Sequence, residues 1–401
     1  MRGGARAKAA LVIAGPALAA FVPIAVVPAL PAMAQAFNLN GSTNGALIAQ
    51  LVMSAPSVMI LFGAPLGAFA SERFGRRRCL LTALMAFALF GAAGAVVSNL
   101  FVLIATRLVL GLATGVSMGL SIAFAGDYFA GEHRERVLGY AAAGSSIFSV
   151  VLLALGGWLV EWGGWHAPFL FYLVGLAAFG IAWVVVDGPT QSEVKERLAA
   201  PERSLVSLFR DLWPAYLLVV FLAAGVFMLT VQGPFLLESN GIASAGTRGM
   251  ILSLYSLTAF SASMTYGFLR RRFGIRQILV LTALSMGVGI AAAAAVHTAA
   301  TFTLVGFTVG IGAGLTDPAI NSVVLARAPE AARARASGFA ISAFFVGQFL
   351  TPILTDPLRR TLGIEGAFVA LGALLIVISG VVLNAAYFST SPATHWAAQK
   401  I

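Results

Sequence analysis

Twelve long apolar runs alternate with short polar segments along this chain of 401 residues. Each run has roughly the 20 apolar residues that an α-helix needs to cross the hydrocarbon core of a bilayer. The predicted spans are 9–33, 45–69, 79–97, 101–126, 137–160, 167–186, 214–237, 248–269, 277–297, 301–325, 337–356 and 367–388. The pattern therefore predicts an all-α membrane protein with twelve transmembrane helices.

Composition supports a lipid environment, because 59% of the residues are hydrophobic and only 10% are charged. Soluble domains carry about a quarter charged residues. The single cysteine, Cys79, excludes a disulfide within the chain and argues against a cysteine-built metal site. The net charge of +10 alone would suggest nucleic acid, but the basic residues stand in short clusters between the apolar runs. Such clusters orient a membrane protein, so no nucleic-acid partner is expected.

The basic residues also predict the orientation of the helices. With the N-terminus in the cytoplasm, 21 of the 25 lysines and arginines fall in cytoplasmic segments. Arg248, Arg359 and Arg360 fall outside, and Arg107 falls within a span. Because positive residues are retained on the cytoplasmic side, we expect a multi-pass protein of the inner membrane with both termini in the cytoplasm.

The longest polar stretch, 188–213, divides the spans into two sets of six. The predicted domains are an N-terminal bundle (1–187), a cytoplasmic linker (188–213) and a C-terminal bundle with a short tail (214–401). A fixed offset of 199 residues pairs Arg73-Phe74-Gly75 with Arg272-Phe273-Gly274, Gly111 with Gly310, Gly115 with Gly314, and Arg134, Arg136 and Gly139 with Arg333, Arg335 and Gly338. We therefore expect parallel six-helix repeats with a substrate site near the membrane midplane, between the repeats.

The loop after the second span carries a family motif. Residues 65–78, PLGAFASERFGRRR, resemble the G-x-L-x-D-R-x-G-R-R loop of the major facilitator superfamily, with Ala68 at the usual glycine and Glu72 at the usual aspartate. The second copy has Arg271 at the acidic position. The resemblance covers essentially the whole chain and implies the major facilitator fold, a transporter that moves a small-molecule substrate, and a monomer.

This loop is also a candidate gate. Gly75 permits a tight turn, and an acid such as Glu72 suits the N-terminal end of a neighbouring helix. The resemblance implies that the acid locks one face of the transporter, and Arg76 or Arg77 is expected to pair with Asp127. The alternative is that the arginines only anchor the topology. The predicted gating residues are Glu72, Arg73, Gly75, Arg76, Arg77 and Asp127.

Two ionisable residues lie at membrane depth, where charge is costly and commonly functional. Arg107 falls in the fourth span, at the position of an arginine found in the family, and Asp317 falls in the tenth span, before Pro318. We expect them to face one another and to take part in substrate binding and proton coupling. For Arg107 the alternative is a structural ion pair; for Asp317 it is a static partner or a polar residue of the cavity wall.

Other sequence features bear on the substrate and on coupling. Pro28-Ala-Leu-Pro31 resembles the P-A-L-P of drug exporters of the Bcr/CflA group, but Ile24 replaces their acid. Leu152 and Leu153 replace the G-P of the antiporter motif in the fifth span. The further predicted cavity residues are Gln50, Gln232, Tyr255 and Asn321.

Motifs for ATP hydrolysis, metalloproteases and serine hydrolases are missing, and the four histidines show no metal-ligand spacing. No enzyme activity, metal or cofactor is therefore expected. The favoured function is proton-coupled efflux, by antiport, of small organic or amphipathic compounds through alternating access. The alternatives are proton symport or facilitated uptake of an organic anion, with Arg107 as the anion partner, and a non-transporting membrane sensor.

Overall fold

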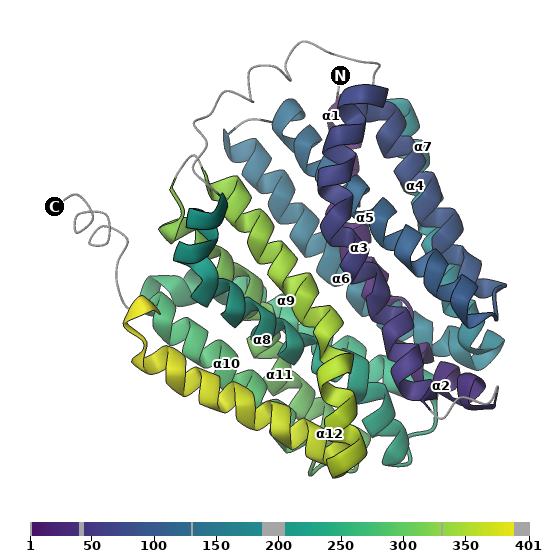
Figure 1. Cartoon of the computed structure of the whole chain (residues 1–401), viewed down its shortest axis with the longest axis vertical. Coiled ribbons are helices and arrows are strands. Elements are labelled where there is room, and N and C mark those ends of the chain that lie inside the picture. The colour runs from purple at the N-terminus through teal and green to yellow at the C-terminus, as the bar shows by residue number, and fades with distance from the viewer. Residues whose placement is uncertain (1, 40–43, 130, 187–204, 330–331, 389–401) are drawn as a thin grey trace. The chain divides into compact units, whose positions relative to one another are not determined.

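A computed structural model describes residues 2–39, 44–129, 131–186, 205–329 and 332–388, and all of its elements are helices (Figure 1). They are α1 (Arg2–Ile24), η1 (Val27–Ala29), α2 (Leu30–Leu39), α3 (Gly45–Phe74), α4 (Arg76–Ala92), η2 (Ala93–Ala95), α5 (Leu100–Tyr128), α6 (Gly131–Gly163), η3 (Gly164–Leu173), α7 (Val174–Val185), α8 (Leu205–Ser239), α9 (Ala245–Arg272), α10 (Ile275–Ala293), α11 (Ala299–Arg327), α12 (Arg333–Asn384) and η6 (Ala386–Phe388). The described part of the chain contains no strand, which confirms the all-α prediction.

Nine helical stretches of the described residues are long and apolar enough to cross a membrane. Two of them hold two predicted spans each: Gly144–Val185 has 42 residues, and Arg335–Asn384 has 50. The second is interrupted at Gly363, where φ is 76°. Because α9 covers the remaining predicted span, 248–269, the nine stretches agree with twelve crossings.

The chain forms two compact units. The first comprises Met1–Ser192 with Leu237–Ser253, and the second comprises Glu193–Leu236 with Leu254–Ile401. Helix α8 begins at Leu205, inside the predicted linker, whereas residues 188–204 and the tail beyond 388 lie outside the described residues. The predicted linker and tail therefore stay predictions.

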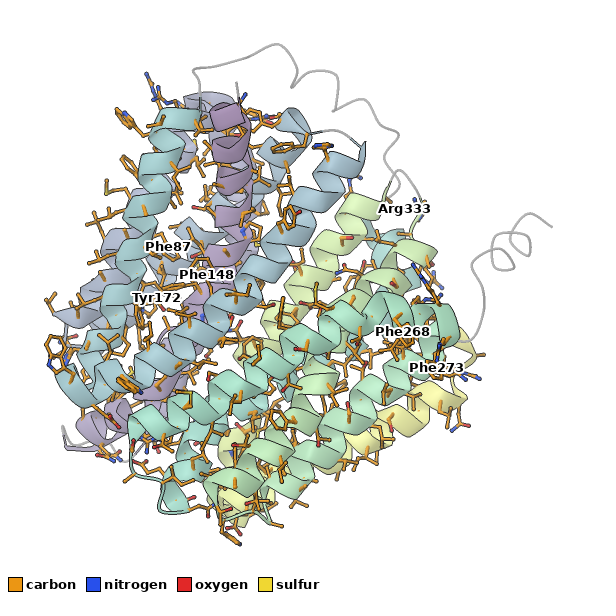
Figure 2. All side chains as sticks on the ribbon, turned by 180° about the vertical axis from the view of Figure 1, so that it is seen from behind. Phe87, Phe148, Tyr172, Phe268, Phe273 and Arg333 are labelled. Carbon is orange, nitrogen blue, oxygen red and sulfur yellow. The ribbon has the colours of Figure 1, made fainter. Side chains whose placement is uncertain are left out.

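In the first unit, α5 packs against α1, α3 and α4, and α1 also packs against α6. Three aromatic side chains, Phe21, Phe87 and Tyr172, fill the space beside α1. The Tyr172 ring lies 5.7 Å from that of Phe87, centroid to centroid (Figure 2). It lies 5.4 Å from the ring of Phe21. The Tyr172 hydroxyl donates to the carbonyl of Val22 at 2.7 Å, so this buried ring keeps its polar atom satisfied.

Glycines bring two helices of the first unit into direct contact. A Cβ placed on Gly111 would collide with the carbonyl oxygen of Pro56 on α3, and one on Gly115 would lie 2.5 Å from the carbonyl oxygen of Ile60. Small residues spaced by four allow this kind of backbone approach between membrane helices. The glycine pair is therefore a packing device of α5 on α3.

The second unit repeats this contact at the same offset of 199. A Cβ on Gly310 would lie 2.9 Å from the carbonyl oxygen of Tyr255 on α9, and one on Gly314 would collide with that of Ala259. Tyr255 and Ala259 are the positions that the offset assigns to Pro56 and Ile60. The internal repeat therefore extends from the sequence to the pairing of helices and to their register.

We predict that Gly314→Ala lowers the stability of the protein by about 1–3 kcal/mol, because its methyl group has no room against the backbone of α9. Gly380→Ala is the matched control, since nothing lies within 4 Å of a Cβ placed there. Thermal unfolding of the detergent-purified variants measures both effects. Equal melting temperatures for the two variants would show that α11 can shift away from α9 to admit the methyl group without a loss of stability.

Candidate functional site

Asp317 lies in the middle of an apolar helix without a charged partner. It stands about 6 Å along the axis from the centre of α11. Its side chain is exposed, and no hydrogen bond or ion pair joins it to another described residue. Pro318, directly after it, has no N–H for the carbonyl of Gly314, so the helix is weakened at this point. Asn321, one turn further along, is exposed on the same side of α11.

Arg107 has a different environment, because its side chain is 1% exposed and lies within the first unit. Its Nη2 donates to the carbonyls of Phe90 at 2.6 Å and Gly91 at 2.7 Å. The guanidinium carbon lies 4.8 Å from the ring centroid of Phe169 and 5.2 Å from that of Tyr172. Arg107 is therefore held by two carbonyls and two aromatic faces.

These contacts have a clear structural meaning. Phe90 and Gly91 lie in the last turn of α4, where backbone carbonyls commonly accept hydrogen bonds from side chains. A cation at a helix C-terminus is favoured by the helix dipole. Arg107 thus caps α4 from the neighbouring helix α5. The expected Arg107–Asp317 pair is not among the ion pairs of the described residues, and its two members belong to different units.

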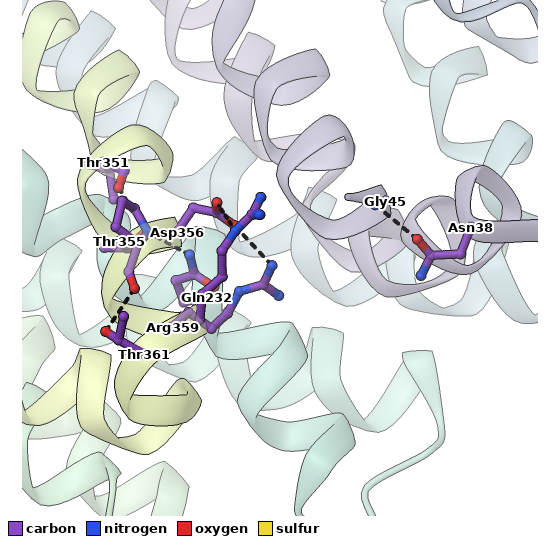
Figure 3. Close-up of polar contacts among 10 residues, drawn as sticks. Asn38, Gly45, Gln232, Thr351, Thr355, Asp356, Arg359 and Thr361 are labelled. Atoms are coloured by element: carbon purple, nitrogen blue, oxygen red, sulfur yellow. Dashed lines mark hydrogen bonds and ion pairs between the residues drawn. The ribbon is translucent and has the colours of Figure 1, made fainter. Parts of the chain in front are cut away.

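The other predicted cavity residues are placed in several ways. Gln50 is fully buried in α3. Gln232 of α8 is also fully buried and donates to the hydroxyl of Thr355 on α12 at 2.7 Å (Figure 3). The Tyr255 hydroxyl donates to the carbonyl of Val226 at 3.2 Å, which ties α9 to α8. In this structure Gln232 and Tyr255 join helices of the second unit, and their contact with substrate stays a prediction.

A second acid, Asp356, is buried at the end of a predicted span and escaped the sequence analysis. It is 5% exposed and forms an ion pair with Arg359 at 3.2 Å (Figure 3). It forms a second ion pair with Arg360 at 2.6 Å, one turn further along α12. The spacing of an acid three and four residues before two arginines was a usable signal, because such residues meet on one helix face. Asp356 is thus the paired acid of the second unit, and Asp317 is an unpaired one.

The loop between α3 and α4 shows the expected turn and one expected ion pair. Gly75 adopts a φ of 84°, which favours glycine. Arg76 Nη1 contacts Asp127 Oδ2 at 2.5 Å, so the pairing with Asp127 is made by Arg76. Arg77 instead donates to the carbonyl of Trp183 at 2.9 Å and lies over its ring.

This ion pair compensates two unfavourable helix ends. Arg76 is the first residue of α4 and Asp127 lies in the last turn of α5, so each charge opposes the dipole of its own helix. Glu72 is exposed and has no hydrogen bond or ion pair with any described residue, and the guanidinium of Arg73 lies over the ring of Phe74. The gating roles of these residues stay predictions.

We predict a coupling free energy of about 0.5–1 kcal/mol between Arg76 and Asp127, since both side chains are partly exposed. The measurement is a double-mutant cycle of unfolding with Arg76→Gln and Asp127→Asn. The matched cycle of Arg77→Gln with Asp127→Asn is expected to give no coupling. Similar coupling free energies in both cycles would show that Asp127 is stabilised by the positive charge of the whole loop and not by Arg76 in particular.

Together these features define an α-helical membrane protein built from a duplicated bundle, the architecture of many secondary transporters. The profile of the Major Facilitator Superfamily matches residues 12–247 and 228–400, that is, nearly the whole chain. The chain belongs to this superfamily of transporters and is not an enzyme.

Named relatives transport different compounds. The chain is 26% identical to a probable 4-methylmuconolactone transporter of Cupriavidus pinatubonensis over 67% of its length, spanning 65% of that relative. It is 27% identical to the 3-(3-hydroxy-phenyl)propionate transporter of Escherichia coli, over 80% of the chain and 79% of the relative. It is 23% identical to the multi-drug resistance efflux pump PmrA of Streptococcus pneumoniae, over 86% and 87%.

The fold has solved counterparts. The inward open xylose transporter XylE of E. coli superposes with a TM-score of 0.76 over 96% of each chain, at 14% sequence identity. Identity at this level carries the fold alone. The structural likeness confirms the major facilitator fold, with twelve helices in two six-helix repeats. It gives no information on the substrate of this chain.

Proposed function

We propose that the protein exports small organic or amphipathic compounds in exchange for protons, by alternating access at the membrane midplane. The observation that carries the proposal is Asp317, an exposed carboxylate near the middle of an apolar helix with no partner among the described residues. An ionisable residue at this depth is costly to keep and is a functional-site hypothesis by default.

Two further observations support efflux. The match to PmrA covers 86% of the chain, more than the matches to the other two named relatives. Apart from Asp317, the charged residues near the centres of the spans are few, and Nη2 of Arg107 is bonded to the end of α4. A binding site with one titratable acid among mostly apolar residues suits an amphipathic compound.

The second candidate function is uptake of an organic anion, by proton symport or facilitation. Its support is the 3-(3-hydroxy-phenyl)propionate transporter of E. coli among the relatives. Asp317 serves this function as well, since a proton carrier works in either direction. The two candidates differ in the direction of flux and in the charge of the transported compound.

Transport assays with two probes separate the candidates. Export predicts that everted membrane vesicles accumulate a lipophilic fluorescent dye when their lumen is acidic, and lose it when an ionophore collapses the gradient. Uptake by proton symport predicts that right-side-out vesicles accumulate radiolabelled 3-phenylpropionate when the outside is acidic, whereas facilitation predicts entry that stops at equal concentrations. Dye accumulation that ignores the pH gradient would contradict proton-coupled export.

A further inference from the structure

The segment 237–253 belongs to the second half of the sequence but packs as part of the first unit. It contains the end of α8, the connecting turn and the start of α9. The helix order places this turn at the end of the first unit opposite to the Arg76–Asp127 pair. The contacts that hold it there therefore lie within the first unit and join residues from the two halves of the sequence.

Glu161, at the end of α6, makes the central contact. Its Oε1 accepts a hydrogen bond from the hydroxyl of Ser244 at 2.5 Å and from the backbone N–H of Gly246 at 2.9 Å. The same Ser244 hydroxyl accepts from the N–H of Thr247 at 3.1 Å, as an N-cap residue does. The carboxylate of Glu161 thus sits at the N-terminus of α9, where backbone donors and the helix dipole favour an anion.

Close packing accompanies this polar contact. A Cβ on Gly157 of α6 would collide with the carbonyl oxygen of Ala245, and one on Gly249 of α9 would collide with that of Leu153. Glycines on both helices let the two backbones touch one turn below Glu161. The contact is therefore built for a specific fit of α6 against α9.

A second carboxylate holds the other side of the turn. Glu238, at the end of α8, accepts from the side-chain amide of Gln35 on α2 at 2.9 Å. It also lies 3.5 Å from Nη1 of Arg248, which is 3% exposed and donates to the carbonyl of Ile242. One acid of each sequence half thus takes part in fastening the turn to the first unit.

The repeat shows that this arrangement is one-sided. The offset of 199 assigns Arg360 to the position of Glu161 and Asp356 to that of Gly157. In the second unit these two residues pair with one another on α12. The anion at a neighbouring helix N-terminus therefore has no copy among the described residues of the second repeat.

We propose that Glu161 and Ser244 form a latch that holds α6 and α9 together at the extracellular end, and that its release is the step that opens this end during transport. The proposal rests on the alternating access of the proposed function. In the latch, the carboxylate of Glu161 accepts hydrogen bonds from donors at the start of α9, and these bonds break as soon as α9 moves away from α6. Glu238 and Arg248 hold the other side of the turn.

The test measures access to α9 by labelling a cysteine. Ala245 is buried at the start of α9, so Ala245→Cys in a Cys79→Ala background reports when α6 moves away. Reconstituted protein is treated from the extracellular side with a membrane-impermeant maleimide, without substrate or pH gradient. Glu161→Gln is expected to raise the labelling rate about three- to tenfold, because the amide lacks the charge that favours the helix N-terminus.

Three further variants keep the test decisive. Ser244→Ala is expected to raise labelling as well, and the double variant to exceed the larger single effect only slightly, because both changes break one contact. Glu365→Gln, an exposed acid near the chain reversal at Gly363, is the matched control and is expected to label at the parental rate. Folding is checked by gel filtration and thermal unfolding before labelling.

The outcomes are distinct. Parental labelling of correctly folded Glu161→Gln or Ser244→Ala, or equal acceleration by Glu365→Gln, overturns the latch. Because the assay uses no substrate and no proton gradient, a failure of dye export in the parent protein contradicts the proposed function alone. Faster labelling in the two latch variants supports the latch whatever compound is transported.

Discussion

Asp317→Asn is expected to abolish proton-driven accumulation of substrate while the protein remains folded. A gradient of one pH unit supplies about 1.4 kcal/mol per proton, or roughly a tenfold concentration ratio. Asparagine matches aspartate in shape but has no ionisable proton, so the ratio in everted vesicles should fall from about ten to about one. Downhill dye movement should persist, because the helix loses no hydrogen bond or ion pair to a described residue.

Asp356→Asn is the matched control for this prediction. It removes a second acid from the same unit, but one whose charge is already compensated by Arg359 and Arg360. We expect lower stability and an unchanged dependence on the pH gradient. If Asp317→Asn kept the full gradient dependence, or if Asp356→Asn lost it, proton coupling would not pass through Asp317.

Arg107→Ala is expected to destabilise the protein by about 2–4 kcal/mol, because it removes the donor from the buried carbonyl of Gly91 and the partly buried carbonyl of Phe90. The lost contacts with Phe169 and Tyr172 add to this cost. The measurement is the melting temperature of purified protein, together with the yield of folded protein in the membrane. Transport per folded molecule should fall less than the yield.

Arg107→Lys tests what the guanidinium contributes beyond its charge. Lysine keeps a donor for the carbonyls but lacks the planar group that lies over the aromatic rings, so an intermediate stability is expected. Arg271→Ala, an exposed arginine on the second repeat, serves as the control and should melt like the parent. Wild-type stability of Arg107→Ala with loss of transport would instead favour the substrate role that the sequence suggested.

Much of the fold could be predicted from the sequence because the bilayer imposes simple rules. The length of the apolar runs specified the crossings, and the offset of 199 specified the repeat. Both predictions agree with helices that pair Gly111 with Pro56 and Gly310 with Tyr255 in the same register. The tight turn at Gly75 and the pairing of Asp127 with a neighbouring arginine were also readable, since both depend on short motifs.

The partners of the ionisable residues were decided by the tertiary structure. The sequence marks Arg107 as costly but does not show that the end of α4 and two rings of η3 surround it. It does not show that Glu161 meets the start of α9, 83 residues away. Apolar patterning determines which segments enter the membrane, whereas the rotation and spacing of the helices determine which polar atoms meet, and these depend on packing along the whole chain.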